Sequence, residues 1–130
     1  MVELYVDQIL SRPVETVTPS TEVRTVADTL IRHDVGSVVV VDDAGRLEGL
    51  VTSTDIVLLV RAGTDTSDVP VSEFMRTDVV TTRPSAPASE VVDAMLEHRI
   101  HHVPVVDGDE VVGMVSTMDL AAVLGRQLEP

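Results

Sequence analysis

Residues 49–55 read Gly-Leu-Val-Thr-Ser-Thr-Asp and residues 113–119 read Gly-Met-Val-Ser-Thr-Met-Asp, so one seven-residue pattern occurs twice in this chain. In each copy a glycine and two apolar residues precede a hydroxyl residue, and an aspartate comes three positions after that hydroxyl. The residues that follow, at 56–60 and 120–124, are apolar enough for a packed helix. Each copy therefore predicts a strand that turns into a helix, with a hydroxyl near the N-cap and a carboxylate in the first turn.

A turn of this kind has two interpretations. Backbone N–H groups at a helix start can hold a phosphate, and a nearby carboxylate can accept hydrogen bonds from a ribose diol, so the combination indicates a nucleotide site. Alternatively, the hydroxyls only cap the helices and the carboxylates only complement the helix dipoles. Both interpretations apply to Asp55, Asp119, Thr52, Ser53, Ser116 and Thr117.

The repeat extends well beyond the seven-residue pattern. With an offset of 65 residues, Thr16 falls on Thr81 and Val26 falls on Val91. From Gly49 onward the offset is 64, because the turn of the second copy is one residue shorter. Two copies of one supersecondary unit explain this register better than chance does.

Each copy predicts the same order of elements: extended segment, helix, strand, turn, strand, helix. The β-branched runs at 37–41 and 103–106 predict strands buried on both faces, and tight Asp/Gly turns lead into strands at 47–52 and 111–116. Apolar residues at i, i+3, i+4, i+7 and i+8 predict one buried stripe on the first helix of each copy. The stripes are Val23, Val26, Ala27, Leu30 and Ile31, with Ser20 or Thr21 as the cap, and Ala88, Val91, Val92, Met95 and Leu96.

Length and composition restrict the class of protein. A chain of 130 residues that is 44% hydrophobic can bury one or two small cores, and we expect one compact unit. There is no cysteine, which excludes disulfides and thiolate metal sites. The N-terminus lacks the basic flank and apolar core of a signal peptide, and no apolar run approaches the ~18 residues of a membrane span. We therefore expect a soluble cytoplasmic protein.

The net charge of −13 arises from 22 acidic residues against nine arginines, with no lysine. Dense carboxylates without lysine resemble the cytosolic proteins of salt-accumulating archaea, in which the ~3 Å Debye length at molar salt removes self-repulsion. An ordinary acidic protein is the alternative. Because no basic stripe is present to release counterions from a nucleic acid, general DNA or RNA binding is disfavoured.

The order of elements and the two Gly-x-x-(Ser/Thr)-x-x-Asp endings resemble a tandem pair of CBS domains, the family named after cystathionine β-synthase. Its most specific motifs here are residues 47–55 and residues 100–107, Ile-His-His-Val-Pro-Val-Val-Asp, followed by residues 113–119. The resemblance covers nearly the whole chain. It implies an α/β (α+β) fold of two repeats, each a small three-stranded sheet with two helices, packed about a pseudo-twofold axis. The repeats would be residues 1–61 and 71–130, joined by a linker at 62–70.

The resemblance also implies up to two clefts between the repeats that bind AMP, ADP, ATP, S-adenosylmethionine or NAD. Asp55 and Asp119 would each hold a ribose, and Thr52 or Ser116 would lie by the phosphates. Val39 and Pro104 would belong to the strand that flanks the adenine, and His101 and His102 would face the phosphates. The remaining implied ligand residues are Thr54, Thr117, Thr16 and Thr81.

The two copies differ at the histidines. Gly36 and Ser37 stand where the second copy has His101 and His102, so only one copy offers cations to a phosphate. The resemblance implies phosphates near the shared axis, so these histidines could serve either cleft. The alternative is that these histidines are surface residues at a strand entrance. Because no H-x₃-H or C-x-x-C spacing is present, we expect no metal site.

No catalytic constellation is present in the sequence. It has no cysteine nucleophile, no lysine for Schiff-base chemistry and no serine in a nucleophile elbow. We expect a non-enzymatic sensor of adenosine nucleotides that requires no cofactor and signals to an effector protein. A CBS pair that docks on a partner without ligand is the first alternative, and a nucleic-acid-binding module is the second. Apolar residues nearly all round the helices at 56–60 and 120–124 predict a homodimer.

Overall fold

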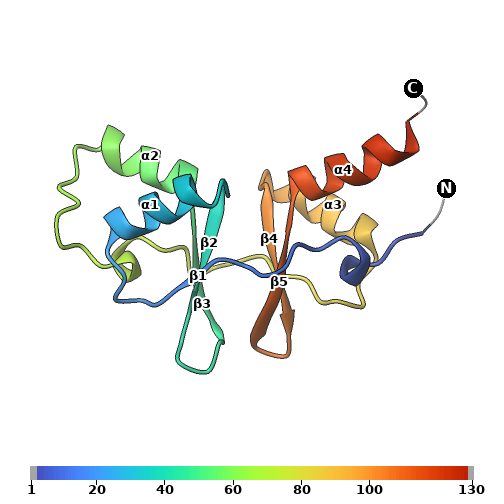
Figure 1. The fold of residues 1–130 in the computed structure, drawn as a ribbon, viewed down its shortest axis with the longest axis horizontal. Coiled ribbons are helices and arrows are strands. Elements are labelled where there is room, and N and C mark those ends of the chain that lie inside the picture. The colour runs from blue at the N-terminus through green and yellow to red at the C-terminus, as the bar shows by residue number, and fades with distance from the viewer. Residues whose placement is uncertain (1–2, 129–130) are drawn as a thin grey trace. The chain divides into compact units, whose positions relative to one another are not determined.

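The computed structural model describes residues 3–128, which divide into two compact units (Figure 1). The Asp55 unit contains residues 15–79, and the Asp119 unit contains residues 3–14 and 80–128. Each unit has its own core, so the expectation of one compact unit is wrong. The units also differ from the sequence repeats, because each contains the first stretch of the other repeat. We call these two stretches, residues 3–14 in the Asp119 unit and residues 71–79 in the Asp55 unit, the leading segments. No helix within residues 3–128 is both long and apolar enough to cross a membrane.

The Asp55 unit is a three-stranded sheet with two helices. Strand β1 pairs in parallel with β2, and β2 pairs antiparallel with β3, as the predicted hairpin requires. Its elements are β1 (Thr16–Val17), α1 (Val23–Arg32), β2 (Ser37–Val41), β3 (Leu47–Thr52), α2 (Ser53–Arg61) and the 3-10 helix η2 (Val71–Glu73). Its core consists of Val26, Leu30, Val38, Val40, Val51 and Val71.

The Asp119 unit repeats this arrangement around an antiparallel hairpin of β4 and β5. Its elements are the 3-10 helix η1 (Val6–Gln8), α3 (Ala88–His98), β4 (His102–Asp107), β5 (Glu110–Ser116) and α4 (Thr117–Gln127). Its core consists of Val6, Ile9, Ala86, Val91, Met95, Val103, Val105 and Val115.

The third strand of the Asp119 unit is reduced to a single parallel bridge between Thr82 and Val105. In the other unit the Val39 N–H donates to the Glu15 carbonyl at 3.0 Å, which extends the pairing of β1. Pro104 occupies the matching position in β4 and has no N–H to donate. The proline therefore shortens the strand that the repeat pattern predicts.

The two stripe helices form where expected, but the stripes are narrower than predicted. Ile31 is 82% exposed and Leu96 is 74% exposed, so the i+8 position of each stripe lies outside the core. The predicted cap of the first helix is also wrong. Glu22 is the N-cap residue of α1 and makes no side-chain cap, while the Thr21 hydroxyl accepts the Thr18 N–H at 3.1 Å instead.

A backbone crossing joins each leading segment to the hairpin of its unit. In the Asp55 unit, Leu50 and Arg76 exchange two backbone hydrogen bonds of 2.9 Å each. In the Asp119 unit, Ser11 and Met114 exchange two such bonds of 2.8 and 3.2 Å. Arg76 and Ser11 are therefore equivalent residues, each placed beside the turn that follows its hairpin.

Thr82 provides a test of the packing in the Asp119 unit. Its Oγ1 atom is buried and has no hydrogen-bond partner among residues 3–128. The matching residue of the other copy is Val17, which packs against a core. Because an unsatisfied buried hydroxyl costs about 1–3 kcal/mol, Thr82→Val should raise the free energy of unfolding by about 1 kcal/mol. Urea unfolding checks this, and a midpoint at or below that of the parent protein would contradict it.

Candidate functional site

Helix α2 begins at a reciprocal capping box. Thr52 is the N-cap, and its hydroxyl accepts the Asp55 backbone N–H at 3.3 Å. In return, Oδ2 of Asp55 accepts the Thr52 backbone N–H at 2.9 Å and lies 3.1 Å from the Thr52 hydroxyl. The predicted N-cap and first-turn carboxylate are confirmed here.

Helix α4 begins in the same way. The Ser116 hydroxyl accepts the Asp119 backbone N–H at 3.3 Å, and Oδ2 of Asp119 accepts the Ser116 backbone N–H at 2.7 Å. The Ser116 hydroxyl lies 3.1 Å from the same oxygen. Both caps use only Oδ2, so the capping interpretation does not exclude a ligand at Oδ1. We call these two segments, residues 52–55 and 116–119, the aspartate turns.

The second carboxylate oxygen has a different partner in each aspartate turn. Oδ1 of Asp55 lies 2.8 Å from Nε and 2.7 Å from Nη2 of Arg76, which forms an ion pair with it. Oδ1 of Asp119 accepts one hydrogen bond of 2.6 Å, from the Ser11 hydroxyl. The hydrogen bond to Asp55, with the attraction of its charge, raises the pKa of Arg76 above its ordinary value.

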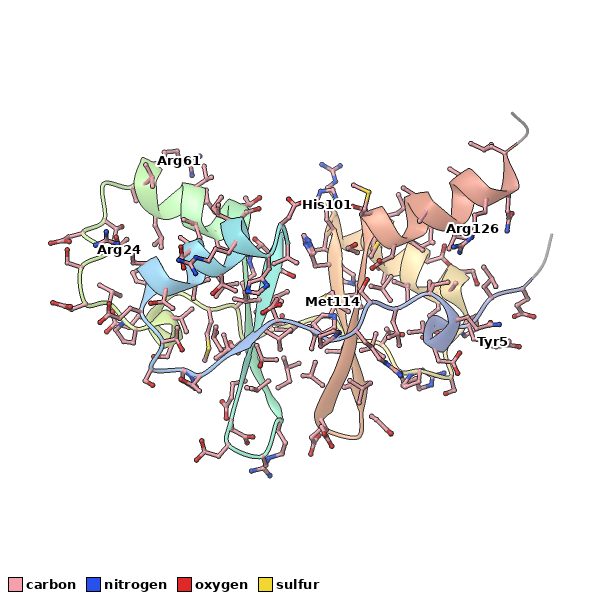
Figure 2. All side chains as sticks on the ribbon, in the orientation of Figure 1. Tyr5, Arg24, Arg61, His101, Met114 and Arg126 are labelled. Atoms are coloured by element: carbon pink, nitrogen blue, oxygen red, sulfur yellow. The ribbon has the colours of Figure 1, made fainter. Side chains whose placement is uncertain are left out.

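The two histidines lie in the Asp119 unit. His102 begins β4 and stands opposite Ser116 in the hairpin, and Figure 2 labels the side chain of the neighbouring His101. The backbone carbonyl of His101 accepts the Thr117 N–H at 3.0 Å. Burial lowers the pKa of His102 below 6.5, and the neighbouring His101 lowers it further, against the opposing charge of Asp119. The histidines and the second aspartate turn therefore lie at one end of one hairpin.

The other residues implied by the family resemblance have varied surroundings. Thr54 and Thr117 are exposed in the first turns of α2 and α4, Thr16 is exposed in β1, and Thr81 is exposed just before the bridge residue Thr82. Val39 and Pro104 are fully buried in β2 and β4. In the Asp55 unit, Gly36 and Ser37 take the place of the histidines, and the Gly36 carbonyl accepts the Ser53 N–H at 2.9 Å. Within residues 3–128 no group of three or more potential ligands could hold a metal ion.

Sequence reasoning missed Arg76 and Ser11. The 65-residue offset does pair these two residues, and that pairing was the available signal. It gave no indication that each contacts an aspartate, because the contact depends on where the leading segment of each repeat crosses a hairpin.

Comparisons with a family model, with curated proteins and with solved structures all give similarity to CBS domains. The family model for the CBS domain matches residues 6–62 and 71–126. The CBS domain-containing protein YhcV of Bacillus subtilis is 34% identical over 116 residues, which are 89% of this chain and 82% of that protein. L-aspartate semialdehyde sulfurtransferase of Methanocaldococcus jannaschii is 32% identical over 121 residues, 92% of this chain but only 23% of that enzyme.

Among solved structures, one similar chain is the CBS domain pair of protein MJ0100, crystallised in complex with 5′-methylthioadenosine and S-adenosyl-L-methionine. Its TM-score is 0.90 and its sequence identity 30%, and the match covers 98% of this chain and 100% of that one.

Proposed function

The chain belongs to the CBS domain family as a tandem pair, and from that premise we propose that it is a non-enzymatic regulatory module that binds an adenosine ligand at an aspartate turn. CBS pairs are typically regulatory and ligand-binding. The observation that carries the proposal is the second oxygen of Asp119. This oxygen, Oδ1, takes no part in the capping box and accepts a hydrogen bond from the Ser11 hydroxyl. A ribose hydroxyl can replace that bond with one of the same type.

The class of ligand is supported by the similar CBS pair of MJ0100, whose crystals contain two adenosine compounds. A ribose at the aspartate turn would donate its hydroxyl protons to Oδ1 of Asp119. A phosphate attached to this ribose would then lie near the N-terminus of α4 and the two histidines. AMP, ADP, ATP, S-adenosylmethionine and NAD all carry the adenosine group that this arrangement would recognise. An effector protein and a cytoplasmic location stay predictions.

A thermal-shift screen with these five compounds and adenosine tests the proposal, at molar and at low salt. A ligand that binds only the folded protein stabilises it by RT ln(1 + [L]/Kd), roughly 2.7 kcal/mol at a hundredfold excess over Kd. We expect at least one compound to raise the melting temperature. If none does so at millimolar concentration in either salt, the ligand-free docking module is the better description.

The histidines predict how binding depends on pH. Because the pKa of His102 lies below 6.5 in the free protein, its imidazole is neutral at pH 8 and gains a proton only in more acidic solution. A bound phosphate favours the protonated form, so the affinity for AMP should rise between pH 8 and pH 6, while the affinity for adenosine should barely change. Calorimetry at both pH values measures the two affinities.

The control for this measurement is the double variant His101→Ala/His102→Ala. The phosphate of AMP itself titrates near a pKa of about 6, and the double variant keeps that contribution while it removes the histidines. The pH dependence that the variant loses therefore belongs to the imidazoles. An identical pH profile in parent and variant would mean that backbone N–H groups alone hold the phosphate.

The homodimer stays a prediction. Large apolar side chains are exposed on both helices that follow the aspartate turns, among them Val60 at 74% and Met118 at 75%. A second copy of the chain would remove these side chains from water. We expect light scattering at tens of micromolar protein to give the mass of a dimer, and a strictly monomeric mass would contradict the prediction.

A further inference from the structure

We infer that Arg76 closes the first aspartate turn to ribose, so that the chain binds its adenosine ligand at Asp119 alone. The inference rests on the proposed function and specifies which of the two aspartate turns carries it. Its basis is a difference between two otherwise equivalent turns.

The two carboxylates share a capping box and a neighbouring backbone crossing, and they differ in the side chain that reaches Oδ1. Both aspartates form the same capping box through Oδ2, and both leading segments cross the hairpin through a pair of backbone hydrogen bonds. The difference lies at the side chain that reaches Oδ1. This side chain is a guanidinium in the Asp55 unit and a hydroxyl in the Asp119 unit.

A ribose displaces the Ser11 hydroxyl from a carboxylate more easily than it displaces the Arg76 guanidinium. A ribose hydroxyl that displaces Ser11 exchanges one hydroxyl–carboxylate hydrogen bond for another, and Ser11 is exposed, so its freed hydroxyl meets water. A ribose that displaces Arg76 must give up two charge-assisted N–H contacts, of 2.8 and 2.7 Å. It would then leave a carboxylate whose side chain is only 9% exposed with neutral donors in place of its countercharge. Ribose therefore competes well at Asp119 and poorly at Asp55.

Two further features favour the same turn. Asp119 forms no ion pair within residues 3–128, so a ribose diol that approaches its carboxylate does not compete with a bound cation. The histidines are present only beside Asp119, whereas Gly36 and Ser37 stand beside Asp55. The groups that would bind ribose and phosphate therefore lie together in the Asp119 unit. In the Asp55 unit, Arg76 already occupies the carboxylate oxygen that a ribose would need.

The test is the stoichiometry of binding in two reciprocal variants. The probe is whichever compound of the screening panel (adenosine, AMP, ADP, ATP, S-adenosylmethionine, NAD) gives the largest thermal shift. Calorimetry should give one site per chain for the parent protein. Arg76→Ser places a serine beside Asp55, as Ser11 lies beside Asp119, and should add a second binding site per chain. Ser11→Arg places an arginine at the second turn and should weaken binding at least tenfold.

Arg24→Ser is the matched control, because it removes the same charge from an exposed position on α1 in the same unit (Figure 2). It should leave one site per chain with affinity unchanged. Circular dichroism melts establish that each variant is folded. If Arg76→Ser does not fold, the Ser11→Arg variant decides, because its prediction does not depend on the first turn.

The outcomes separate this inference from the proposed function. If no compound binds the parent protein, both are wrong. If the parent already binds two equivalents, or if Ser11→Arg binds as tightly as the parent, the closure by Arg76 is wrong and the proposed function stands. A loss of affinity for a phosphorylated probe in folded Arg76→Ser would also overturn the closure, because it would make Arg76 a ligand-binding residue.

Discussion

Asp119→Ala is expected to weaken the binding of the adenosine ligand at least tenfold while lowering the free energy of unfolding by only about 1 kcal/mol. The carboxylate is proposed to accept two ribose hydrogen bonds, and hydrogen bonds to charged groups contribute about 1.5–3 kcal/mol each. Asp119 also forms the capping box and accepts an exposed hydrogen bond from Ser11, and losses at helix caps are typically about 1 kcal/mol. Calorimetry and urea unfolding of the same samples measure the two effects.

Asp55→Ala serves as the control and should show the opposite pattern. It removes a buried carboxylate that holds the Thr52 cap and the Arg76 ion pair, so it should cost more stability than Asp119→Ala. If ribose binds only at Asp119, the affinity should be unchanged. Normal binding by Asp119→Ala, together with a much lower melting temperature, would mean that Asp119 is only a cap.

Gly49→Ala is expected to lower the free energy of unfolding by about 2–3 kcal/mol, because an added methyl group overpacks a close backbone crossing. A Cβ at this position would lie 2.9 Å from the Arg76 carbonyl oxygen and 2.7 Å from the Met75 sulfur. The methionine can move aside, but the carbonyl is held by the Leu50 N–H at 2.9 Å. The crossing must therefore open, which also moves Arg76 away from Asp55. Urea unfolding measures the loss.

Two other glycines, Gly113 and Gly125, supply graded controls for this substitution. At Gly113 the nearest backbone atom to the added Cβ is the Ser11 carbonyl at 3.2 Å, so Gly113→Ala should cost less than Gly49→Ala. At Gly125, inside α4, the added Cβ would meet no atom within 4 Å among the described residues beyond its own helix backbone and its chain neighbours. Gly125→Ala should stabilise the protein by up to about 1 kcal/mol through helix propensity alone. Equal stabilities for Gly49→Ala and Gly125→Ala would contradict this account of the crossing.

The local features of the fold could be predicted from the sequence because short-range chemistry determines them. The strand at 37–41 has the predicted bounds, and α2 and α4 begin directly after Thr52 and Ser116, since a hydroxyl followed by a carboxylate three residues later satisfies the free N–H groups of a helix start. A reciprocal cap involves only four consecutive residues. It can therefore be recognised without any knowledge of the rest of the chain.

The features that could not be predicted depend on contacts between distant parts of the chain. Ile31 and Leu96 fit the helical periodicity, yet they are exposed, because the periodicity does not define how wide a face the small sheet covers. The shortened strand in the Asp119 unit depends on an N–H that Pro104 lacks. The partner of Asp55 is 21 residues away along the chain and that of Asp119 is 108 residues away. No local pattern relates residues at those separations.

The exchange of leading segments bears on how such a chain can arise and how it can be divided. In a single copy of the repeat, the leading segment would lack the hairpin with which it pairs here. The hairpin of that copy would likewise lack a leading segment to pair with. Two such copies could complete each other only by trading these segments, as in a domain-swapped dimer. Gene duplication and fusion of a swapped dimer would yield this connectivity directly. The smallest autonomous piece should accordingly start within one repeat and end within the next, as residues 15–79 do.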